Sequence, residues 1–349
     1  MIINVNFNKT LSNERKTKEY KYTPYSKNII LLFIDSVSRA NSMRQLKKTL
    51  KFFEKFMFYK GAFNEKYPSE IFHSFQFFKY HSFKFHTSGN FPLLFYGRTK
   101  EENKTLITKY LKENGYITCY TSDLCIKDNI RTKHNMTKEE AYDHQFLICD
   151  PNKDHYNFNL IKCLYEKNNA EHLYDYNNKF WRIYENNRKY LLTVSNDAHE
   201  GTLEVLKYID DIIYNFLINL FNDNLLKETT IFLISDHGVG MPSFYYLYNF
   251  YGIEENLPML YMIINDRKNI SYFKQYSHIY ENQQIFITAY DIYNTISNII
   301  FGDKYFYIKN KTKNKEYPKT GKGKSLFEQI SIKNRKPDKY DNMSYVSCK

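Results

Sequence analysis

Three stretches of apolar residues in this chain each end in acidic or imidazole side chains. They are residues 28–35, which end in Asp35; residues 189–195, followed by Asp197 and His199; and residues 231–234, followed by Asp236 and His237. Continuous apolar runs of this length are typical of central parallel strands that are covered on both faces. Because amphipathic helical patterns separate the runs, the sequence predicts an α/β fold with a mostly parallel central sheet and helices on both faces.

The same three runs predict a place for chemistry. The carboxyl ends of parallel strands lie at one edge of a sheet, so the acids and imidazoles are expected to converge there. Three carboxylates and two imidazoles in one crevice would repel one another and lose solvation unless cations were bound. Two divalent metal ions about 3.5–4 Å apart would offset this crowding and would support phosphoryl-transfer chemistry. The structural alternative is that Asp35 and Asp236 cap the turns that follow them and that His199 is an ordinary loop residue.

The remaining elements follow from hydrophobic periodicity and from the positions of glycine and proline. We expect helices at 43–56, 100–115, 171–187, 203–222 and 285–301, and further strands at 116–121 and 257–264. Residues 87–97 are expected to form a loop that enters a short helix, which Gly97 ends. Residues 57–85 and 123–170 show weak periodicity and receive no firm assignment. The expected organisation is a polar flexible arm over residues 1–28, a single α/β domain over residues 29–330 and a C-terminal tail over residues 331–349.

Composition excludes some classes of protein and leaves others open. The net charge of +12 is spread over scattered lysines without a nucleic-acid-binding motif, so a nucleic-acid binder is the weakest interpretation. No apolar run is long enough to span a membrane, and residues 1–28 lack the apolar segment of a signal peptide. The five cysteines show no CxxC spacing, which argues against a zinc ribbon and leaves one or two disulfides open. Six Asn-x-Ser/Thr sites are compatible with a glycoprotein.

Four blocks of sequence, taken in their order, resemble a known family. They are residues 33–39 with Arg44 and Thr49; residues 196–200 before the helix that contains Asp210; residues 234–238; and residues 323–327 with Arg335 and Cys348. Together they resemble the DUF229 group of sulfatase-like proteins within the alkaline phosphatase superfamily, over most of residues 29–348. The resemblance implies an alkaline-phosphatase-like core.

The resemblance also implies roles for individual residues. Thr87 matches the nucleophile, because Asn90 and Gly97 follow it at the spacing of a T-x-x-N…G block, and Asn90 would stabilise the developing oxyanion. Asp35, Asp236 and His237 would hold the metal ion that activates Thr87. Asp197 and His199 would hold a second ion, with His278 as a further ligand because it is the only histidine after His237. The ions are expected to be zinc, with manganese or calcium as alternatives. The structural alternative is a capping Thr87 with a structural Asn90.

The expected activity is metal-dependent hydrolysis or transfer of phosphate or sulfate esters through the Thr87 hydroxyl, for example as a phosphodiesterase. No C/S-x-P-x-R motif is present, so the aldehyde-hydrate chemistry of type I sulfatases is not expected. The expected substrate is a small anionic ester or a glycan- or lipid-linked one, and no nucleic-acid partner is expected. The resemblance implies an extracellular, lumenal or membrane-associated location, with a membrane tether outside this chain. The alternative function is a catalytically decayed domain that serves as a surface or interaction module; Gly89, which stands where the family pattern has proline, favours it.

Overall fold

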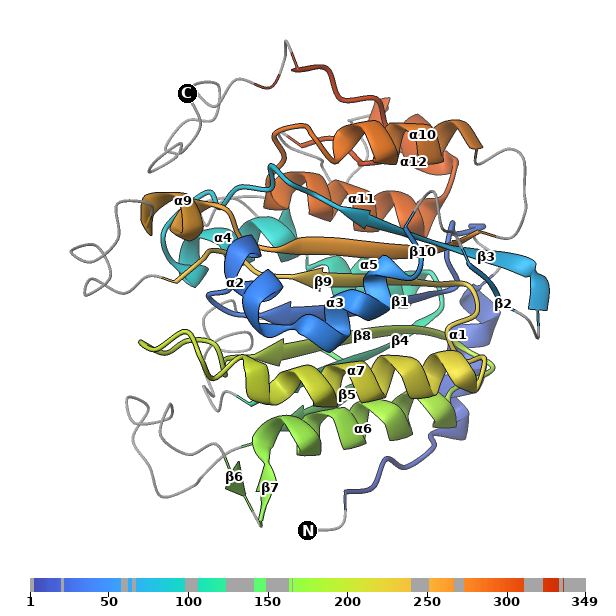
Figure 1. Ribbon diagram of the computed structural model, residues 1–349. Helices are drawn as coiled ribbons and strands as arrows, with labels where there is room; N and C mark the ends of the chain where they lie inside the picture. The colour runs from blue at the N-terminus through green and yellow to red at the C-terminus, as the bar shows by residue number, and fades with distance from the viewer. Residues whose placement is uncertain are drawn as a thin grey trace.

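A mixed eight-stranded sheet forms the centre of the computed structural model, in the order β2-β3-β10-β9-β1-β8-β4-β5 (Figure 1). The structure describes residues 3–19, 22–57, 62–64, 67–97, 106–123, 141–148, 163–164, 166–239, 251–266, 273–310, 323–332 and 335. The strands of this sheet are β1 (Asn28–Ile34), β2 (Ala62–Asn64), β3 (Tyr67–Gln76), β4 (Tyr116–Ser122), β5 (His144–Leu147), β8 (Arg188–Ser195), β9 (Thr229–Ile234) and β10 (Leu260–Asp266). A separate small hairpin consists of β6 (Cys163–Leu164) and β7 (Lys167–Asn168).

Strand β1 lies at the centre of the parallel part of the sheet. It pairs in parallel with β8 on one side and β9 on the other, and the parallel arrangement continues through β4 to β5. Every residue of β1 is buried, as expected for a strand covered on both faces. The arrowheads of β1, β8 and β9 point to the same side of Figure 1, so their carboxyl ends share one edge. The prediction of a mostly parallel sheet is confirmed.

Strands β10, β3 and β2 extend the sheet in antiparallel fashion beyond β9. Ser235, which follows β9, and Met259, which precedes β10, meet at the carboxyl edge, where Ser235 N donates to Met259 O at 3.0 Å. Because β10 begins at the edge where β9 ends, it runs back along β9, and an antiparallel pair results. Strand β3 falls in the 57–85 region, where periodicity gave no assignment.

Helices cover both faces of the sheet, as predicted. One face packs against α3 (Lys47–Glu54), α6 (Asn169–Ile183) and α7 (Lys207–Asn222), which lie on the side turned to the viewer in Figure 1. The other face packs against α4 (Thr87–Tyr96), α5 (Ile107–Glu113), α10 (Phe273–Asn282), α11 (Ala289–Phe301) and α12 (Lys304–Asn310). Alternate residues of β1 enter the two cores: Leu31 and Phe33 face α4 and α11, and Leu32 and Ile34 face α3 and α7. Two short helices, α2 (Arg39–Gln45) and α9 (Tyr251–Asn256), lie beside the carboxyl edge.

The N-terminal segment differs from the expected flexible arm. Residues Lys9–Lys18 form helix α1, in which Arg15 is buried and pairs with Asp143 at 2.8 Å. Ser12 Oγ also donates to Asn187 Oδ1 at 2.8 Å. Long-range polar contacts of this kind are invisible to hydrophobic periodicity, which explains why the polar composition suggested an arm.

The described residues include two of the five cysteines. Cys119 is buried and Cys163 is exposed, and both are free thiols, whereas Cys125, Cys149 and Cys348 lie outside the described residues. Among the described helices, none combines the length and apolar character that crossing a membrane requires.

Candidate active site

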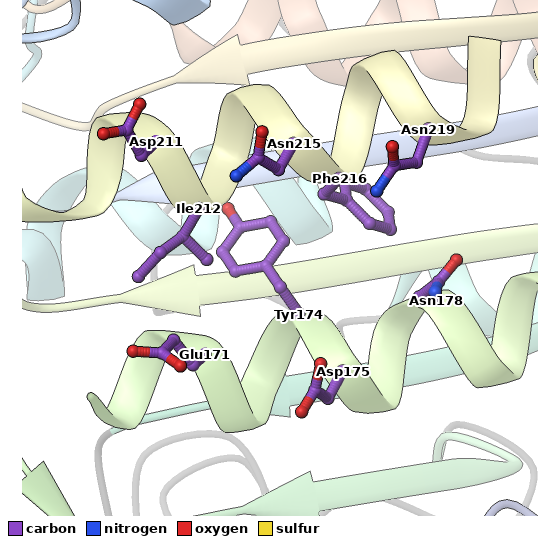
Figure 2. Close-up of a pocket in the computed structure, with 9 residues that line it drawn as sticks. All are labelled: Glu171, Tyr174, Asp175, Asn178, Asp211, Ile212, Asn215, Phe216 and Asn219. Atoms are coloured by element: carbon purple, nitrogen blue, oxygen red, sulfur yellow. The ribbon is translucent and has the colours of Figure 1, made fainter. Parts of the chain in front are cut away.

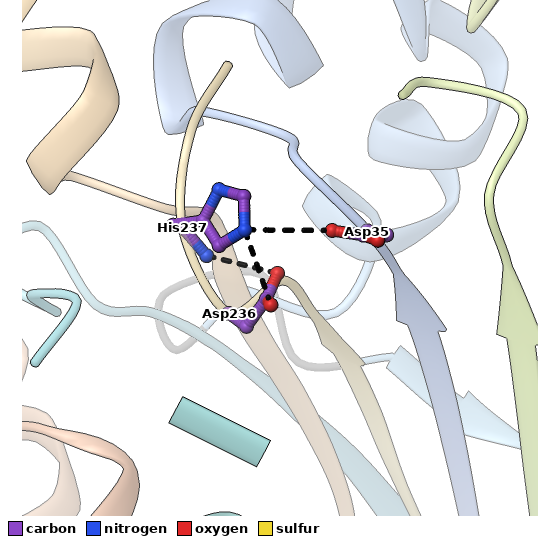
Figure 3. A group of neighbouring side chains, drawn as sticks. All are labelled: Asp35, Asp236 and His237. Atoms are coloured by element: carbon purple, nitrogen blue, oxygen red, sulfur yellow. Dashed lines mark hydrogen bonds and ion pairs between the residues drawn. The ribbon is translucent and has the colours of Figure 1, made fainter. Parts of the chain in front are cut away.

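Asp35, Asp236 and His237 meet at the carboxyl edge of the sheet (Figure 3). Asp35 directly follows β1, and Asp236 and His237 follow β9, so the pairing of these two strands brings the residues together. One ligand atom from each lies within 4.8 Å of the others, and all three side chains are buried. His237 Nε2 lies 3.4 Å from Asp236 Oδ2 and 3.7 Å from Asp35 Oδ1. We call these three residues the Asp35 cluster.

The backbone around the cluster is held in place by local hydrogen bonds. Ser36 adopts the left-handed conformation with φ of 61°, which is unusual for a residue other than glycine, and its hydroxyl donates to Asp35 Oδ1 at 3.1 Å. Ser235 connects the two strand ends: its Oγ accepts from Val37 N and donates to His237 O, both at 2.9 Å. The sharp turn after β1 and the turn after β9 are therefore tied to each other.

Gly238 allows helix α9 to pack directly behind His237. Gly238 N donates to Glu255 O at 2.8 Å. A Cβ atom at this position would lie 2.0 Å from Glu254 O, so no larger residue fits without a shift of the backbone. This close approach explains why glycine follows the Asp-His pair.

Thr87 brings a hydroxyl group to the same cluster. It is the first residue of α4, after the extended residue His86. Its Oγ1 donates to Asp35 Oδ1 at 3.3 Å and lies 3.3 Å from His237 Nε2. Thr87 therefore places a hydroxyl at a helix N-terminus, beside the carboxylates and the imidazole of the Asp35 cluster.

The electrostatics of the cluster fit a bound cation. Burial and the charge of Asp236 raise the pKa of Asp35 to about 6. Burial lowers the pKa of His237, but the charges of Asp236 and Asp35 outweigh it, so the pKa rises above its usual value. Asp236 Oδ2 is buried and accepts no hydrogen bond. His237 Nδ1 lies 2.6 Å from Gly238 O, so in the neutral ring Nδ1 carries the hydrogen and Nε2 has a lone pair that faces the carboxylates. Two buried carboxylates and one imidazole form a suitable donor set for a divalent metal ion.

Asp197 and His199 lie on the turn after β8, next to the cluster but not within it. Asp197 is buried and His199 is exposed. Because Ile34 pairs with Ser195 across β1 and β8, this turn begins beside Asp35, and the charge of His199 lowers the pKa of Asp35. Within the described part of the chain, the three-residue Asp35 cluster is the group compact enough to hold an ion, so a second ion on Asp197 and His199 stays a prediction.

The structure does not bring His278 to the Asp35 cluster. His278 lies on α10, and its Nδ1 is 3.0 Å from Phe327 O. The imidazole thus connects α10 to the buried residues around Leu326, on the side of the molecule formed by α10 and α11. The expectation that His278 is a metal ligand came from its order in the sequence alone, and we exclude it from the proposed ligand set.

Asn90 also has a different position from the one expected. Its Oδ1 accepts from Phe83 N at 2.7 Å and Lys84 N at 3.1 Å, and its Nδ2 donates to Lys84 O at 2.6 Å and His86 O at 3.2 Å. Both amide hydrogens are used and the residue is buried, so the side chain has no donor to offer an oxyanion. The structural alternative holds: Asn90 shapes the loop that leads into Thr87.

Sequence reasoning missed one acidic residue at this edge, Asp123. It follows β4, the neighbour of β8, and Asp123 Oδ1 accepts from Asn196 N at 2.9 Å. Burial and the charge of Asp197 raise the pKa of Asp123 to about 7. The signal was the same as for the other strands, a strand followed by Asp. The predicted strand ended at Thr121, however, and Asp123 was counted with the following region of weak periodicity.

Other residues of the family-like blocks have structural roles. Asp210 accepts from Lys48 N and Thr49 N at 2.8 Å and so caps the start of α3. Arg335 makes a two-pronged ion pair with the fully buried Asp291 of α11, with its Nη2 donating to Asp291 Oδ1 at 2.6 Å.

A groove of about 240 Å³ lies between α6 and α7, away from the Asp35 cluster (Figure 2). Tyr174 and Asp175 of α6 and Asp211 and Phe216 of α7 are among its lining residues. None of the predicted site residues lines this groove, so it is not the candidate active site.

The sheet order, the helices on both faces and the Asp35 cluster define an α/β protein whose candidate site lies at the carboxyl edge of a mostly parallel sheet. The family model described as "Protein of unknown function (DUF229)" matches residues 4–339, and the chain therefore belongs to the DUF229 family. No curated protein matches the chain.

Solved structures share the fold at low sequence identity. The C-terminal periplasmic domain of EcEptC from Escherichia coli is 10% identical, with a TM-score of 0.54 over 81% of this chain and 84% of that one. A protein in the alkaline phosphatase superfamily from Vibrio parahaemolyticus is 12% identical, with a TM-score of 0.53 over 85% and 76%. The lipoteichoic acid synthase LtaP from Listeria monocytogenes is 11% identical, with a TM-score of 0.52 over 83% and 78%. These likenesses establish the alkaline-phosphatase-like fold.

Proposed function

We propose that this protein is a metal-dependent enzyme that hydrolyses or transfers phosphate or sulfate esters, with the Thr87 hydroxyl as the nucleophile. One observation carries the proposal: Thr87 Oγ1 lies 3.3 Å from both Asp35 Oδ1 and His237 Nε2, at the carboxyl edge of the sheet. Thr87 and the cluster come from three separate parts of the sequence, and their meeting follows from the fold rather than from a local motif. Edges of this kind are where open α/β sheets bind ligands.

Asp35, Asp236 and His237 would hold one divalent metal ion, with zinc as the first candidate. The unbonded, buried Asp236 Oδ2 and the Nε2 lone pair of His237 favour this assignment. When bound, such an ion would lower the pKa of the Thr87 hydroxyl and offset charge on the ester oxygens. Asp197 and His199 would hold a second ion at the end of β8, as the sequence predicts.

The residues of the chain prepare the nucleophile. The hydrogen bond from Thr87 Oγ1 to Asp35 Oδ1 points the hydroxyl hydrogen at a carboxylate, so Asp35 is placed to accept the proton. The Thr87 oxygen then forms a bond to phosphorus or sulfur, and the bond to the departing ester oxygen breaks. The departing alkoxide takes a proton from solvent at the exposed side of the site, where His199 lies. Water or a second alcohol then displaces Thr87, which recovers its proton.

The substrate class is proposed from the structural neighbours. One neighbour is a lipoteichoic acid synthase, and Ps i-CgsB, with a TM-score of 0.52 and 14% identity over 79% of this chain and 72% of that one, is known in complex with a neocarrahexaose. A glycan- or lipid-linked anionic ester, or a smaller anionic ester, agrees with the substrates of these neighbours. A net charge of +12 would also attract an anionic substrate. The periplasmic domain among the neighbours supports a location outside the cytosol.

Metal analysis combined with kinetics tests the proposal. Purified protein is expected to retain zinc, manganese or calcium and to hydrolyse an aryl phosphate or an aryl sulfate, with loss of activity on chelation. Thr87→Ala is expected to lower kcat by about 10³-fold or more, because it removes the attacking oxygen, while metal content is retained. Thr87→Ser is expected to keep partial activity.

Thr17→Ala is the matched control, since Thr17 is an exposed threonine on α1 whose hydroxyl donates to Glu14 O. A wild-type protein without bound metal and without turnover of either ester would refute the enzyme and favour the interaction module. Full activity in Thr87→Ala would refute the nucleophile while leaving the metal centre intact.

A further inference from the structure

Asp123 makes a dense set of hydrogen bonds to the turn that carries Asp197 and His199. Its Oδ1 accepts from Asn196 N at 2.9 Å and from Asn196 Nδ2 at 2.8 Å. Its Oδ2 accepts from Ser195 Oγ at 2.9 Å and from Asn196 N at 3.0 Å. The main chain and the side chain of Asn196 are therefore both held by one carboxylate, which fixes the direction in which the chain leaves β8.

The placement of Asp123 follows from strand register. Ser122 of β4 pairs with Val194 of β8, and Asp123 N donates to Val194 O at 3.4 Å. Asp123 thus stands one residue beyond β4 at the same edge as the candidate site and reaches sideways to the end of its neighbour. This geometry needs the parallel pairing of β4 and β8, so it is a property of the fold and not of one loop.

Ser195 transmits the contact from Asp123 to Asp197. The Ser195 hydroxyl has one hydrogen and two nearby carboxylates, Asp123 Oδ2 at 2.9 Å and Asp197 Oδ2 at 3.4 Å. The shorter distance gives the hydrogen to Asp123. The same hydroxyl oxygen then accepts from Asp197 N at 3.4 Å. Asp123 therefore orders the main chain of Asp197 through Ser195.

The far side of the same turn is held by a second carboxylate. Glu200 accepts from Glu204 N at 3.0 Å and from Val205 N at 3.2 Å. His199 N donates to Asn196 O at 2.9 Å, so the turn closes on itself between the two carboxylates. Of the two, Asp123 is the one that holds the beginning of the turn, where Asp197 lies.

We propose that Asp123 is a positioning residue that fixes the 195–199 turn and thereby presents Asp197 and His199 to the candidate site. The proposal rests on the proposed function in one respect: the catalytic consequence requires that Asp197 and His199 act in the reaction. The ordering of the turn itself can be measured without any activity.

The test compares Asp123→Asn with Asp175→Asn. Asparagine keeps the size of the side chain but replaces one accepting oxygen with an NH₂ group, which cannot accept from Ser195 or Asn196. Asp175 is an exposed acid on α6 whose ion-pair partner, Lys167, is also exposed, so Asp175→Asn removes a charge without touching the turn. Hydrogen exchange of peptides that cover residues 195–206, a melting curve, and kcat and KM are measured for both variants.

We expect Asp123→Asn to speed exchange in residues 195–206 by at least about tenfold, with the rest of the protein unchanged. If the enzyme proposal holds, kcat is expected to fall about 10–100-fold with a smaller change in KM, because the substrate still meets the Asp35 cluster. Ser195→Ala, which removes only the transmitting hydroxyl, is expected to give a smaller effect of the same kind.

Unchanged exchange in residues 195–206 would overturn the proposal, as would faster exchange spread evenly over the molecule. Local loosening with kcat and KM at wild-type values would also overturn it, since the turn would then not serve the reaction. If the wild-type protein turns over no ester, the enzyme proposal fails, whereas the exchange experiment still decides whether Asp123 orders the turn.

Discussion

Two residues of α4, one helical turn apart, show how local surroundings determine a role. Thr87, at the first position of the helix, directs its hydroxyl to Asp35 and His237. Asn90 directs its amide back to the main chain of Phe83 and Lys84. Residues three apart lie on the same side of a helix, so the spacing alone placed both near the site. Their roles differ because the loop before α4 offers main-chain N–H and C=O groups to Asn90, and these groups take up its side-chain amide.

A buried lysine far from the candidate chemistry sets a pH dependence of stability. Lys189 is 1% exposed, donates to Trp181 O at 2.9 Å and lies 4.6 Å from the centre of the Trp181 ring. Burial lowers the pKa of Lys189 to about 7. Between about pH 7 and the unfolded pKa of about 10.4, the unfolded chain binds more protons than the folded one, so this group makes the protein more stable as pH rises.

Lys189→Met is therefore expected to raise the free energy of unfolding by about 1–3 kcal/mol at pH 6, where the charged lysine is costly to bury. The gain is expected to fall toward zero by about pH 10, where the wild-type side chain is neutral. Urea denaturation of both proteins across this range measures the difference. Lys16→Met, at an exposed position on α1, is the control; a gain for Lys189→Met that does not vary with pH would contradict the assignment.

At the scale of elements, the short helix α9 contacts both turns that carry the residues of the Asp35 cluster. Arg44 of α2 pairs with Glu254 at 2.7 Å, and Ser38 Oγ donates to the same carboxylate at 2.7 Å. Gly238 N donates to Glu255 O, which joins the turn after β9 to the same helix. The turns that carry Asp35 and His237 are thus both fixed to α9.

Gly238→Ala is expected to push α9 away from the turn after β9, because the added Cβ would lie 2.0 Å from Glu254 O. We expect the free energy of unfolding to fall by about 1–3 kcal/mol, the usual cost of overpacking, and metal affinity to fall with it. Chemical denaturation and metal titration measure the two effects. Gly201→Ala, at an exposed glycine, is the control, and equal stability of the two variants would show that α9 moves aside without cost.

At the scale of the whole molecule, residues 323–327 and Arg335, which we call the C-terminal block, pack against α10 and α11. Leu326 and Phe327 are buried there, and Arg335 pairs with Asp291, whose side chain is 0% exposed. Asp291 also accepts from Lys324 N at 2.8 Å and from Thr288 N at 2.8 Å. A block of few apolar residues is therefore fixed by one buried ion pair and its hydrogen bonds.

Arg335→Ala is expected to lower the free energy of unfolding by about 3–5 kcal/mol, since it leaves the Asp291 carboxylate buried without its cation. The double variant Arg335→Ala, Asp291→Asn is expected to recover part of the loss, because the remaining amide carries no charge. Thermal and urea denaturation of the three proteins measure this. A loss below about 1 kcal/mol for the single variant would place Arg335 among exposed ion pairs instead.

The parts of the molecule that could be predicted from sequence are those with local signals. An unbroken apolar run that ends in an acid identified β1, β8 and β9, and the sharing of one edge by parallel strands then brought Asp35, Asp236 and His237 together. The catalytic and metal-binding roles of these residues stay predictions. The length of the helices on both faces followed from periodicity to within a few residues for α6, α7 and α11.

The remaining features depend on contacts between distant residues. The antiparallel direction of β10 depends on where the chain runs between β9 and β10, and the packing of α1 depends on Asp143, more than a hundred residues away. His278 was chosen because it is the only histidine after His237, and order in the chain carries no information about distance in the fold. Asp123 could have been found if the rule applied to the other three runs had been extended to β4, which has 7 residues, as β1 has.

The position of β1 between β8 and β9 has a consequence for attempts to alter this protein. Side chains alternate between the faces along a strand, so a slip of β1 by one residue would turn Asp35 away and exchange the β1 side chains between the two cores. The neighbours on either side would lose their shared partner at the same moment. Insertions or deletions within residues 28–34 should therefore abolish the fold and the site in a single step, whereas changes of side-chain size that preserve the count can be tolerated one at a time.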